Sequence, residues 1–257
     1  MFSFLKKRRR ERLKTTPTPS FWRDLLQDEV PYFNKLLPED QEELINHMKV
    51  FLAEKEFSGA LGFVVTDHVK LIIAAYACIL LLHRKTDYYP LLDLIVIYPE
   101  AYIATVKRDH NGVCVVTREA RLGESWPWGT LVLSWSAIRA DICHTGSSRN
   151  LIFHEFAHQL DQESGQSDGA PVLDKSSQYQ GWANILSFEY KKLIYDIERD
   201  HKHFFDDYAA TSPAEFFAVI TEYFFDRPLK FKKKHPQLYQ QLTTFYQQDP
   251  ARRYDQI

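Results

Sequence analysis

The sequence predicts an α+β fold in which a small mixed sheet packs against a helix that carries two histidines. The first supporting observation is His-Glu-Phe-Ala-His at residues 154–158, inside an apolar stretch with the periodicity of a buried helix. A second helix is expected at 213–226, because Ser212, Pro213 and Glu215 form an N-terminal capping pattern. Residues rich in β-branched and aromatic side chains predict strands at 93–98, 102–107, 113–117 and 130–135.

The first 14 residues differ in charge from the rest of the chain. They have a net charge of +6, while the remainder has −8. No apolar segment of the kind found in signal peptides follows this basic run, so secretion is not expected. We expect a disordered basic arm and a Thr/Pro linker at 1–20, a helical part at 21–90 and a catalytic part at 91–257. Two alternatives to a solvated tail are weak contact of the arm with a membrane surface, through Phe2, Phe4 and Leu5, and contact of the basic run with nucleic acid.

The remaining elements follow from apolar periodicity and turn residues. Asn111-Gly112 predicts a hairpin between two of the strands. The apolar run Leu71–Leu82 is shorter than the ~20 residues of a transmembrane helix, so it predicts a core helix and no transmembrane segment. Ser147 or Ser148 is expected to cap the His-bearing helix, and Gly165 to end it. Helices are expected at 38–55, 67–84, 136–144, 148–163, 179–199, 213–226 and 235–247.

The pattern at residues 154–158 indicates a zinc hydrolase. On a helix, His154 and His158 share one face and can bind one ion from the same side. Glu155 lies near the same rim, where a carboxylate can accept a proton from water. An ordinary core helix with hydrogen-bonded His and Glu side chains is the alternative, but it would bury three polar groups in an apolar segment without a metal ion.

The site needs a third protein ligand, and three acidic residues are candidates. Asp161 lies seven residues after His154, about 10.5 Å along a helix, which is too far for the same ion. We expect it to accept a hydrogen bond from a His ligand, with a solvated helix-end carboxylate as the alternative. Glu215 and Glu222 lie two turns apart on the second helix, and either is chemically suitable. Capping alone could also explain Glu215.

Five segments of the chain carry a resemblance: Leu151–Asp161, Asp207–Phe225, Ile97–Pro99, Gly123–Trp126 and Phe245–Pro250. Together they resemble the Mlc titration factor A family of bacterial cytosolic zinc peptidases. The resemblance extends from about residue 20 to about residue 250. It implies a zincin-like fold with a second ligand-bearing helix, as in gluzincins, similar to the peptidase domain of anthrax lethal factor.

The same resemblance assigns roles to individual residues. It implies that one zinc ion per chain is bound by His154, His158 and Glu215, with Glu155 as general base. It also implies that Tyr208 is an active-site tyrosine whose hydroxyl supports the oxyanion. Glu222 is then left to orient a ligand or to serve a structural purpose. The family name implies a regulatory role through binding Mlc, a repressor of glucose-transport genes.

A strand shortly before the metal helix is the candidate for binding substrate. In zincins an edge strand holds extended peptide by backbone pairing, and we expect that role for Leu131, Val132, Leu133, Ser134 and Trp135. A plain sheet strand is the alternative.

Composition is compatible with these expectations. The chain has three cysteines, Cys78, Cys114 and Cys143, far apart in sequence, so we expect a reduced, cytoplasmic protein without disulfides. Two functions from different classes remain. One is a zinc peptidase that acts on peptides, and the resemblance suggests an aminopeptidase. The other is a non-catalytic regulator that sequesters a transcriptional repressor; direct binding of nucleic acid is not expected.

Overall fold

The computed structural model describes residues 2–110, 113–121, 123–126, 129–143 and 148–254. Its helices are α1 (Phe2–Lys14), α2 (Ser20–Glu29), α3 (Pro38–Glu54), α4 (Asp67–Ile79), α5 (Trp135–Cys143), α6 (Leu151–Gln162), α7 (Tyr179–Glu198), α8 (Pro213–Asp226), α9 (Pro228–Lys234), α10 (Pro236–Tyr246) and α11 (Pro250–Tyr254), with short 3-10 turns η1 (Phe33–Lys35), η2 (Ser176–Gln178) and η3 (Asp207–Ala210). Its strands are β1 (Glu56–Gly59), β2 (Leu94–Tyr98), β3 (Tyr102–His110), β4 (Val113–Arg121), β5 (Gly123–Trp126) and β6 (Thr130–Ser134).

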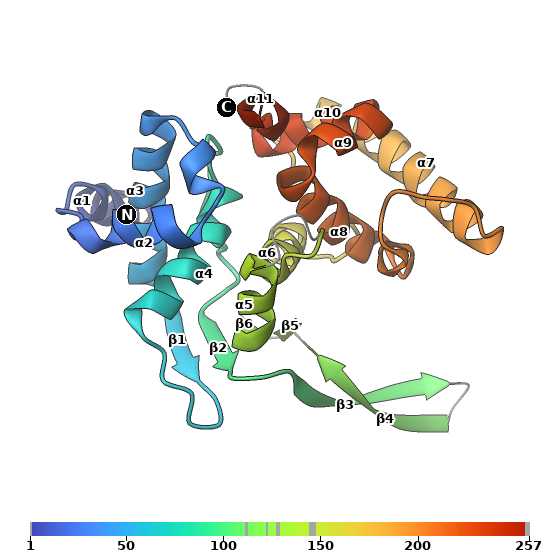
Figure 1. Cartoon of the computed structure of the whole chain (residues 1–257), viewed down its shortest axis with the longest axis horizontal. Coiled ribbons are helices and arrows are strands. Elements are labelled where there is room, and N and C mark those ends of the chain that lie inside the picture. The colour runs from blue at the N-terminus through green and yellow to red at the C-terminus, as the bar shows by residue number, and fades with distance from the viewer. Residues whose placement is uncertain (1, 111–112, 122, 127–128, 144–147, 255–257) are drawn as a thin grey trace.

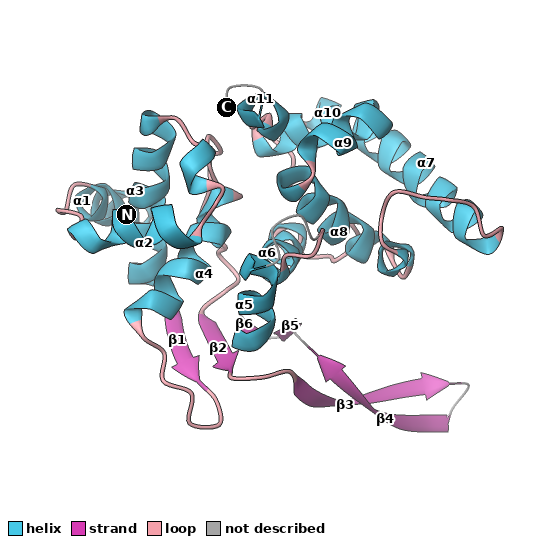
Figure 2. Cartoon of the chain, in the orientation of Figure 1, coloured by secondary structure: helices cyan, strands magenta, loops and turns pink. Residues whose placement is uncertain are grey.

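Two groups of helices flank the centre of the molecule. Helices α1–α4 lie together on one side and α7–α11 on the other, with α5, α6 and α8 between them (Figure 1). The strands lie at one end of this arrangement, and the β3–β4 ribbon extends away from it (Figure 2). The predicted α+β class is therefore confirmed.

A four-stranded mixed sheet supports the central helices. Its strand order is β1-β2-β6-β5, in which β1, β2 and β6 are parallel and β5 runs antiparallel to β6. Residues 131–134 of β6 are buried, as expected for a strand with neighbours on both sides. The side chains of β2 alternate, with Ile95 and Ile97 fully buried. The sheet therefore offers one apolar surface on which a helix can pack.

The strand predictions were partly correct. Strands were found at both 93–98 and 130–135, except that Trp135 begins α5. The segments 102–107 and 113–117 belong to the longer strands β3 and β4, which pair as the hairpin signal predicted, although Asn111 and Gly112 themselves lie outside the described residues. Strands β1 and β5 were missed because each has only four residues and a glycine, too few for a pattern to appear.

The helix predictions missed short or basic segments. Helices α2, α9 and α11 were not expected, and α4 ends at Ile79 instead of continuing to residue 84. The run Leu71–Ile79 is buried, as expected for a core helix. No helix within the described ranges is both long and apolar enough to cross a bilayer.

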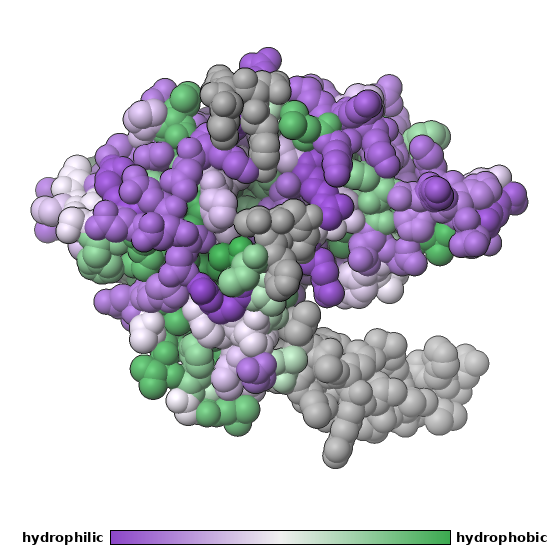
Figure 3. Space-filling model, viewed as in Figure 1, coloured by the Kyte–Doolittle hydropathy of each residue, from purple (hydrophilic) through white to green (hydrophobic). Residues whose placement is uncertain are grey.

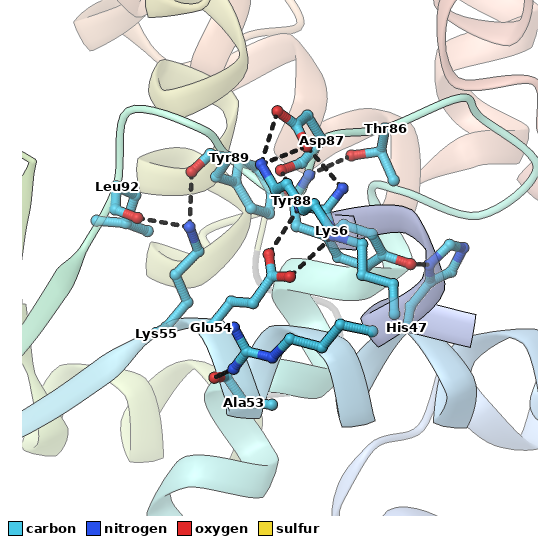
Figure 4. Close-up of polar contacts among 12 residues, drawn as sticks. Lys6, His47, Ala53, Glu54, Lys55, Thr86, Asp87, Tyr88, Tyr89 and Leu92 are labelled. Carbon is cyan, nitrogen blue, oxygen red and sulfur yellow. Dashed lines mark hydrogen bonds and ion pairs between the residues drawn. The ribbon is translucent and has the colours of Figure 1, made fainter. Parts of the chain in front are cut away.

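The expectation of a disordered N-terminal arm was wrong for residues 2–14. These residues form α1, which packs against α3. The Arg10 guanidinium binds both carboxylate oxygens of Glu54, at 2.9 and 2.7 Å, and reaches Asp87 at 2.6 Å. Lys6 also pairs with Asp87, at 2.8 Å (Figure 4). Half-buried, bidentate ion pairs fix the helix in a way that composition alone does not reveal.

Helix α6 is the central element of the core. Its Phe156 ring lies 4.9 Å from the Tyr89 ring and 5.8 Å from the Phe51 ring, both from the N-terminal half of the chain. Its Phe153 ring lies 5.2 Å from Tyr76 on that side and 4.9 Å from Phe225 of α8 on the other. Aromatic packing from both sides therefore fixes the position and rotation of α6.

The predicted division at residue 90 stays a prediction. Strand β1 precedes that position, yet it pairs along its full length with β2, which follows it. The sheet beneath α6 is thus built from residues on both sides of the proposed boundary.

Candidate metal centre

Helix α6 presents two imidazoles on one side. The Asn150 side chain, and not a serine, caps the helix by accepting a hydrogen bond from the Phe153 N–H at 3.1 Å. His154 and His158 lie one turn apart, with ring centroids at 4.9 Å, and their Nε2 atoms are 3.3 Å from each other. Both Nε2 atoms therefore face the same point in space.

Helix α8 brings a carboxylate to that point. Its first turn is capped by Ser212, whose hydroxyl accepts a hydrogen bond from the Glu215 N–H at 3.1 Å, and Pro213 occupies the first helical position. The Glu215 Oε2 atom lies 3.0 Å from Nε2 of His154 and 3.3 Å from Nε2 of His158. The backbone N–H of Glu215 thus takes part in the cap, while its side chain faces the histidines instead of completing a capping box.

The three ligand atoms have the spacing that a zinc ion requires. Zn–N and Zn–O bonds of about 2.0–2.1 Å in tetrahedral geometry place neighbouring ligand atoms about 3.3–3.4 Å apart. The observed separations are 3.0, 3.3 and 3.3 Å. Two neutral imidazoles with one carboxylate are also the donor set typical of catalytic zinc sites, which keep a fourth position open. The residues present therefore fit zinc.

Glu222 orients one of the histidines. Its Oε1 atom lies 2.8 Å from Nδ1 of His154, and its Oε2 atom accepts a hydrogen bond from the Asn150 N–H at 2.6 Å. A carboxylate can only accept, so His154 donates its Nδ1 proton to Glu222, and its Nε2 atom, which faces Glu215, is the nitrogen available to a metal ion. Of the two carboxylates on α8, Glu215 is therefore placed among the ligand atoms and Glu222 behind them.

The histidines and carboxylates of this cluster shift each other's pKa values in opposite directions. Burial would lower the pKa of His154, but hydrogen bonds with Glu215 and Glu222 outweigh it and raise this pKa well above its usual value. Burial would raise the pKa of Glu215, yet its contacts with His154 and His158 hold this pKa far below the usual range. The carboxylate is thus ionised and ready to bind a cation.

Glu155 is buried beside a glycine. Only 5% of its surface is exposed, and burial raises the pKa of its carboxyl group above the usual value. A Cβ atom at Gly123 of β5 would lie 2.7 Å from the Glu155 Cδ atom, so a larger residue here would displace this carboxylate. A raised pKa suits a group that accepts and then returns a proton near neutral pH. The role of Gly123 was missed because nothing in the sequence indicates which residue β5 meets.

Tyr208 lies at the rim of the centre. It belongs to η3, where Asp206 caps the turn by accepting a hydrogen bond from the Tyr208 N–H at 2.9 Å. Its ring centroid is 6.0 Å from that of His154, and 53% of the residue is exposed. The side chain is therefore both close to the cluster and accessible to a ligand from solvent.

Asp161 has a different partner from the one expected. Its Oδ2 atom accepts a hydrogen bond from the Gly169 N–H at 2.9 Å, while its Oδ1 atom has no hydrogen-bond partner within the described part of the chain. Asp161 is fully buried, and burial raises the pKa of its carboxyl group. The residue thus anchors the loop after α6 instead of orienting a His ligand.

The expected peptide-binding strand is not at the edge of the sheet. The segment containing Leu131, Val132, Leu133 and Ser134 is β6, which pairs with β2 on one side and β5 on the other, so its backbone groups are already used. Trp135 belongs to α5. The edge next to α6 is β5, and the prediction for residues 131–135 was wrong because a sequence does not reveal strand order.

An HExxH helix joined by a glutamate from a second helix is the arrangement of metallopeptidases, and comparison with known proteins agrees. Residues 4–247 match the family of glucose-regulated metallo-peptidases M90. An uncharacterized protein of Synechocystis sp., slr2042, is 39% identical over 244 residues, covering 94% of this chain and 89% of that protein. Mlc titration factor A of Escherichia coli (strain SMS-3-5 / SECEC) is 31% identical over 236 residues, covering 90% of this chain and 87% of that protein.

The chain therefore belongs to the M90 metallopeptidase family, and its resemblance to Mlc titration factor A is confirmed.

Proposed function

We propose that this protein is a zinc peptidase in which His154, His158 and Glu215 hold the metal ion and Glu155 is the general base. The observation that carries the proposal is the convergence of three ligand atoms, 3.0–3.3 Å apart, beside a buried carboxylate of raised pKa. When bound, zinc would act as a Lewis acid and lower the pKa of water at the site toward about 7.

The protein side chains perform the proton transfers. Glu155 accepts a proton from the attacking water and returns it to the leaving amine, for which its raised pKa is suited. Tyr208, exposed at the rim, donates its hydroxyl proton in a hydrogen bond to the developing oxyanion. Glu222 keeps the proton of His154 on Nδ1 throughout, because its second oxygen is fixed by the Asn150 N–H.

Substrate is proposed to bind along β5. This strand pairs with β6 on one side and is the last strand of the sheet on the other, so an extended peptide can add there by backbone hydrogen bonds. Its first residue, Gly123, touches the carboxylate of Glu155, and a peptide paired with β5 would therefore pass directly beside the base.

The test compares the wild type with Glu155→Gln in zinc content and in hydrolysis of chromogenic peptides. The variant keeps the shape of the side chain and all three ligands, so zinc should stay at about one ion per chain. Loss of the base should lower kcat by about 10²–10⁴-fold. Equal turnover in both proteins would disprove the role of Glu155, and no zinc in a folded wild type would disprove the site. Cleavage of free but not N-acetylated peptides would identify an aminopeptidase.

A second candidate function is regulation by binding the repressor Mlc in the cytoplasm. It is supported by the 31% identity with Mlc titration factor A. The two functions are compatible in one chain, and Glu155→Gln separates them: binding of Mlc should survive the substitution if it does not depend on catalysis. Failure of the wild type to bind Mlc in titration calorimetry would leave peptidase activity as the function.

A further inference from the structure

Helix α1 presents unpaired positive charge to solvent although one side of it is fixed to the protein. Arg10 and Lys6 face inward to Glu54 and Asp87, and Leu13 packs against the core. The basic residues Lys7, Arg8 and Arg12 are exposed and have no hydrogen-bond or ion-pair partner among the residues that the structure describes.

The carboxylates that contact residues of α1 are already paired with other cations. Asp87 and Glu54 are paired with the inward-facing cations, and Glu11 pairs with Lys14 at 3.0 Å. The three unpaired cations therefore determine the sign of the local potential, in a chain whose residues 15–257 carry a net charge of −8.

Two apolar side chains share the exposed surface of α1. Phe4 is 70% exposed and Leu5 is 56% exposed, both one turn before Arg8. Single exposed apolar residues are common, but an aromatic and an aliphatic residue beside unpaired Lys and Arg side chains are typical of helices that lie in a membrane interface. We call the surface formed by Phe4, Leu5, Lys7, Arg8 and Arg12 the α1 face.

We propose that the α1 face binds an anionic lipid surface, with Phe4 and Leu5 entering the boundary between headgroups and acyl chains and the three cations contacting lipid phosphates. Nucleic acid would also attract the cations, but it would leave both apolar side chains in water, so their exposure favours lipid. Because ion pairs already hold α1 in place, little ordering is needed on binding. The proposal does not depend on peptidase activity.

Another exposed apolar segment lacks this charge complementarity. Leu61 and Val64, in the loop between β1 and α4, are 82% and 75% exposed, and hydrophobic surface is visible in that part of the molecule (Figure 3). Residues 56–66 contain no Lys or Arg, so no feature of this loop identifies an anionic partner.

The test is flotation of the zinc-loaded chain with vesicles of phosphatidylcholine alone or mixed with phosphatidylglycerol. We expect binding only to the mixed vesicles, and a decrease as salt is added. Replacing Lys7, Arg8 and Arg12 together by Glu should lower the partition coefficient by about 100-fold, because each basic residue near an anionic leaflet contributes roughly fivefold. This variant keeps Lys6 and Arg10, and its melting temperature shows whether α1 remains docked.

A charge-matched control uses Lys191, Lys230 and Lys233, which are exposed on α7 and α9. Replacing these three by Glu changes the net charge equally and should leave vesicle binding within about twofold, since they are remote from the α1 face. An equal loss of vesicle binding in both triple variants would mean that binding depends only on the net charge of the chain, and it would overturn the proposal.

A second variant separates lipid from nucleic acid. Phe4→Ser with Leu5→Ser keeps every charge and should weaken vesicle binding by about tenfold, because it removes the apolar contribution. Binding to duplex DNA, measured in parallel, should be weaker than binding to mixed vesicles and unaffected by this variant. Tight binding to DNA with no vesicle binding by the wild type would overturn the lipid assignment.

Discussion

Among the residues that the structure describes, two regions gather histidine and carboxylates within 4.8 Å, and one of them has the geometry of a metal centre. In the first, Nε2 of His154, Nε2 of His158 and one oxygen of Glu215 converge on a common point. In the second, His83 lies between two carboxylates: its Nε2 atom is 3.2 Å from Asp40 and its Nδ1 atom is 3.0 Å from Glu43.

The difference lies in where the ring nitrogens point. The two nitrogens of one imidazole face away from each other, so a single ion cannot use both, and each carboxylate of the second cluster already has its own nitrogen. Asp40 is also paired with Arg253 at 3.1 Å, and Glu43 accepts the His83 N–H at 2.8 Å. We infer that the second cluster is an ion-pair network that joins α3 to the end of the chain, and that proximity of ligand-type residues is not sufficient for a metal site.

The strongest test of this comparison removes one histidine from each cluster. His158→Ala should reduce the zinc content from about one ion per chain to background and abolish peptide hydrolysis, because two ligands rarely retain zinc. His83→Asn should leave zinc content unchanged. Metal analysis after dialysis distinguishes the two, and equal zinc loss in both variants would contradict the assignment of the centre.

A smaller effect on zinc binding is expected when a residue that hydrogen-bonds to a metal ligand is replaced. Glu222→Gln weakens the acceptor for the Nδ1 proton of His154, and loss of such a partner typically raises the zinc dissociation constant by about 10–100-fold. Asp161→Asn is the control, since Asp161 bonds to Gly169 and not to a ligand, and the constant should change by less than about twofold. Competition with a zinc chelator measures both; a larger effect at Asp161 would restore its predicted role.

The contact between β5 and the base can be tested without touching any ligand. Gly123→Ala forces a Cβ atom against the Glu155 carboxylate and should lower kcat by about tenfold with zinc retained. Gly181→Ala in α7 is the matched control, because its new Cβ would meet only the Gln241 side chain, at 4.0 Å. Steady-state kinetics of the two variants should differ; identical kinetics would mean that Glu155 can move freely.

The smallest effect is expected from a substitution in the ion-pair network, where we expect a change in stability and not in zinc binding. His83 has a φ of +63°, a conformation that Asn tolerates, so His83→Asn removes both ring contacts to the carboxylates with little backbone strain. Because Asp40 is nearly buried and keeps only Arg253, we expect a loss of about 1–2 kcal/mol in the free energy of unfolding. Denaturant unfolding with and without zinc measures this loss. A much larger loss in the zinc-bound protein alone would link this network to the metal centre.

Local chemistry made part of the site predictable. The spacing of His154 and His158 on one helix face, and the Ser212 cap that begins α8, depend on residues within a few positions of each other, and both were found as expected. The sheet strands at 93–98 and 130–135 were predictable for the same reason, since alternation and β-branching are properties of short segments.

Predictions failed where the partner is distant in sequence. Helix α1 is ordered by Glu54 and Asp87, more than 40 residues away, and no rule of composition includes that contact. Asp161 was assigned to a histidine on its own helix, but it bonds to a loop that folds back onto α6.

By itself, the sequence determined that one helix carries two zinc-type ligands with a carboxylate between them, because helical periodicity follows from the backbone. Tertiary structure alone decided that Glu215 faces the histidines while Glu222 fixes the His154 proton, and that β5 rather than β6 is the outermost strand of the sheet as described. These choices depend on how α8 and the sheet pack against α6, which is set by the sum of many apolar contacts between segments far apart in the chain.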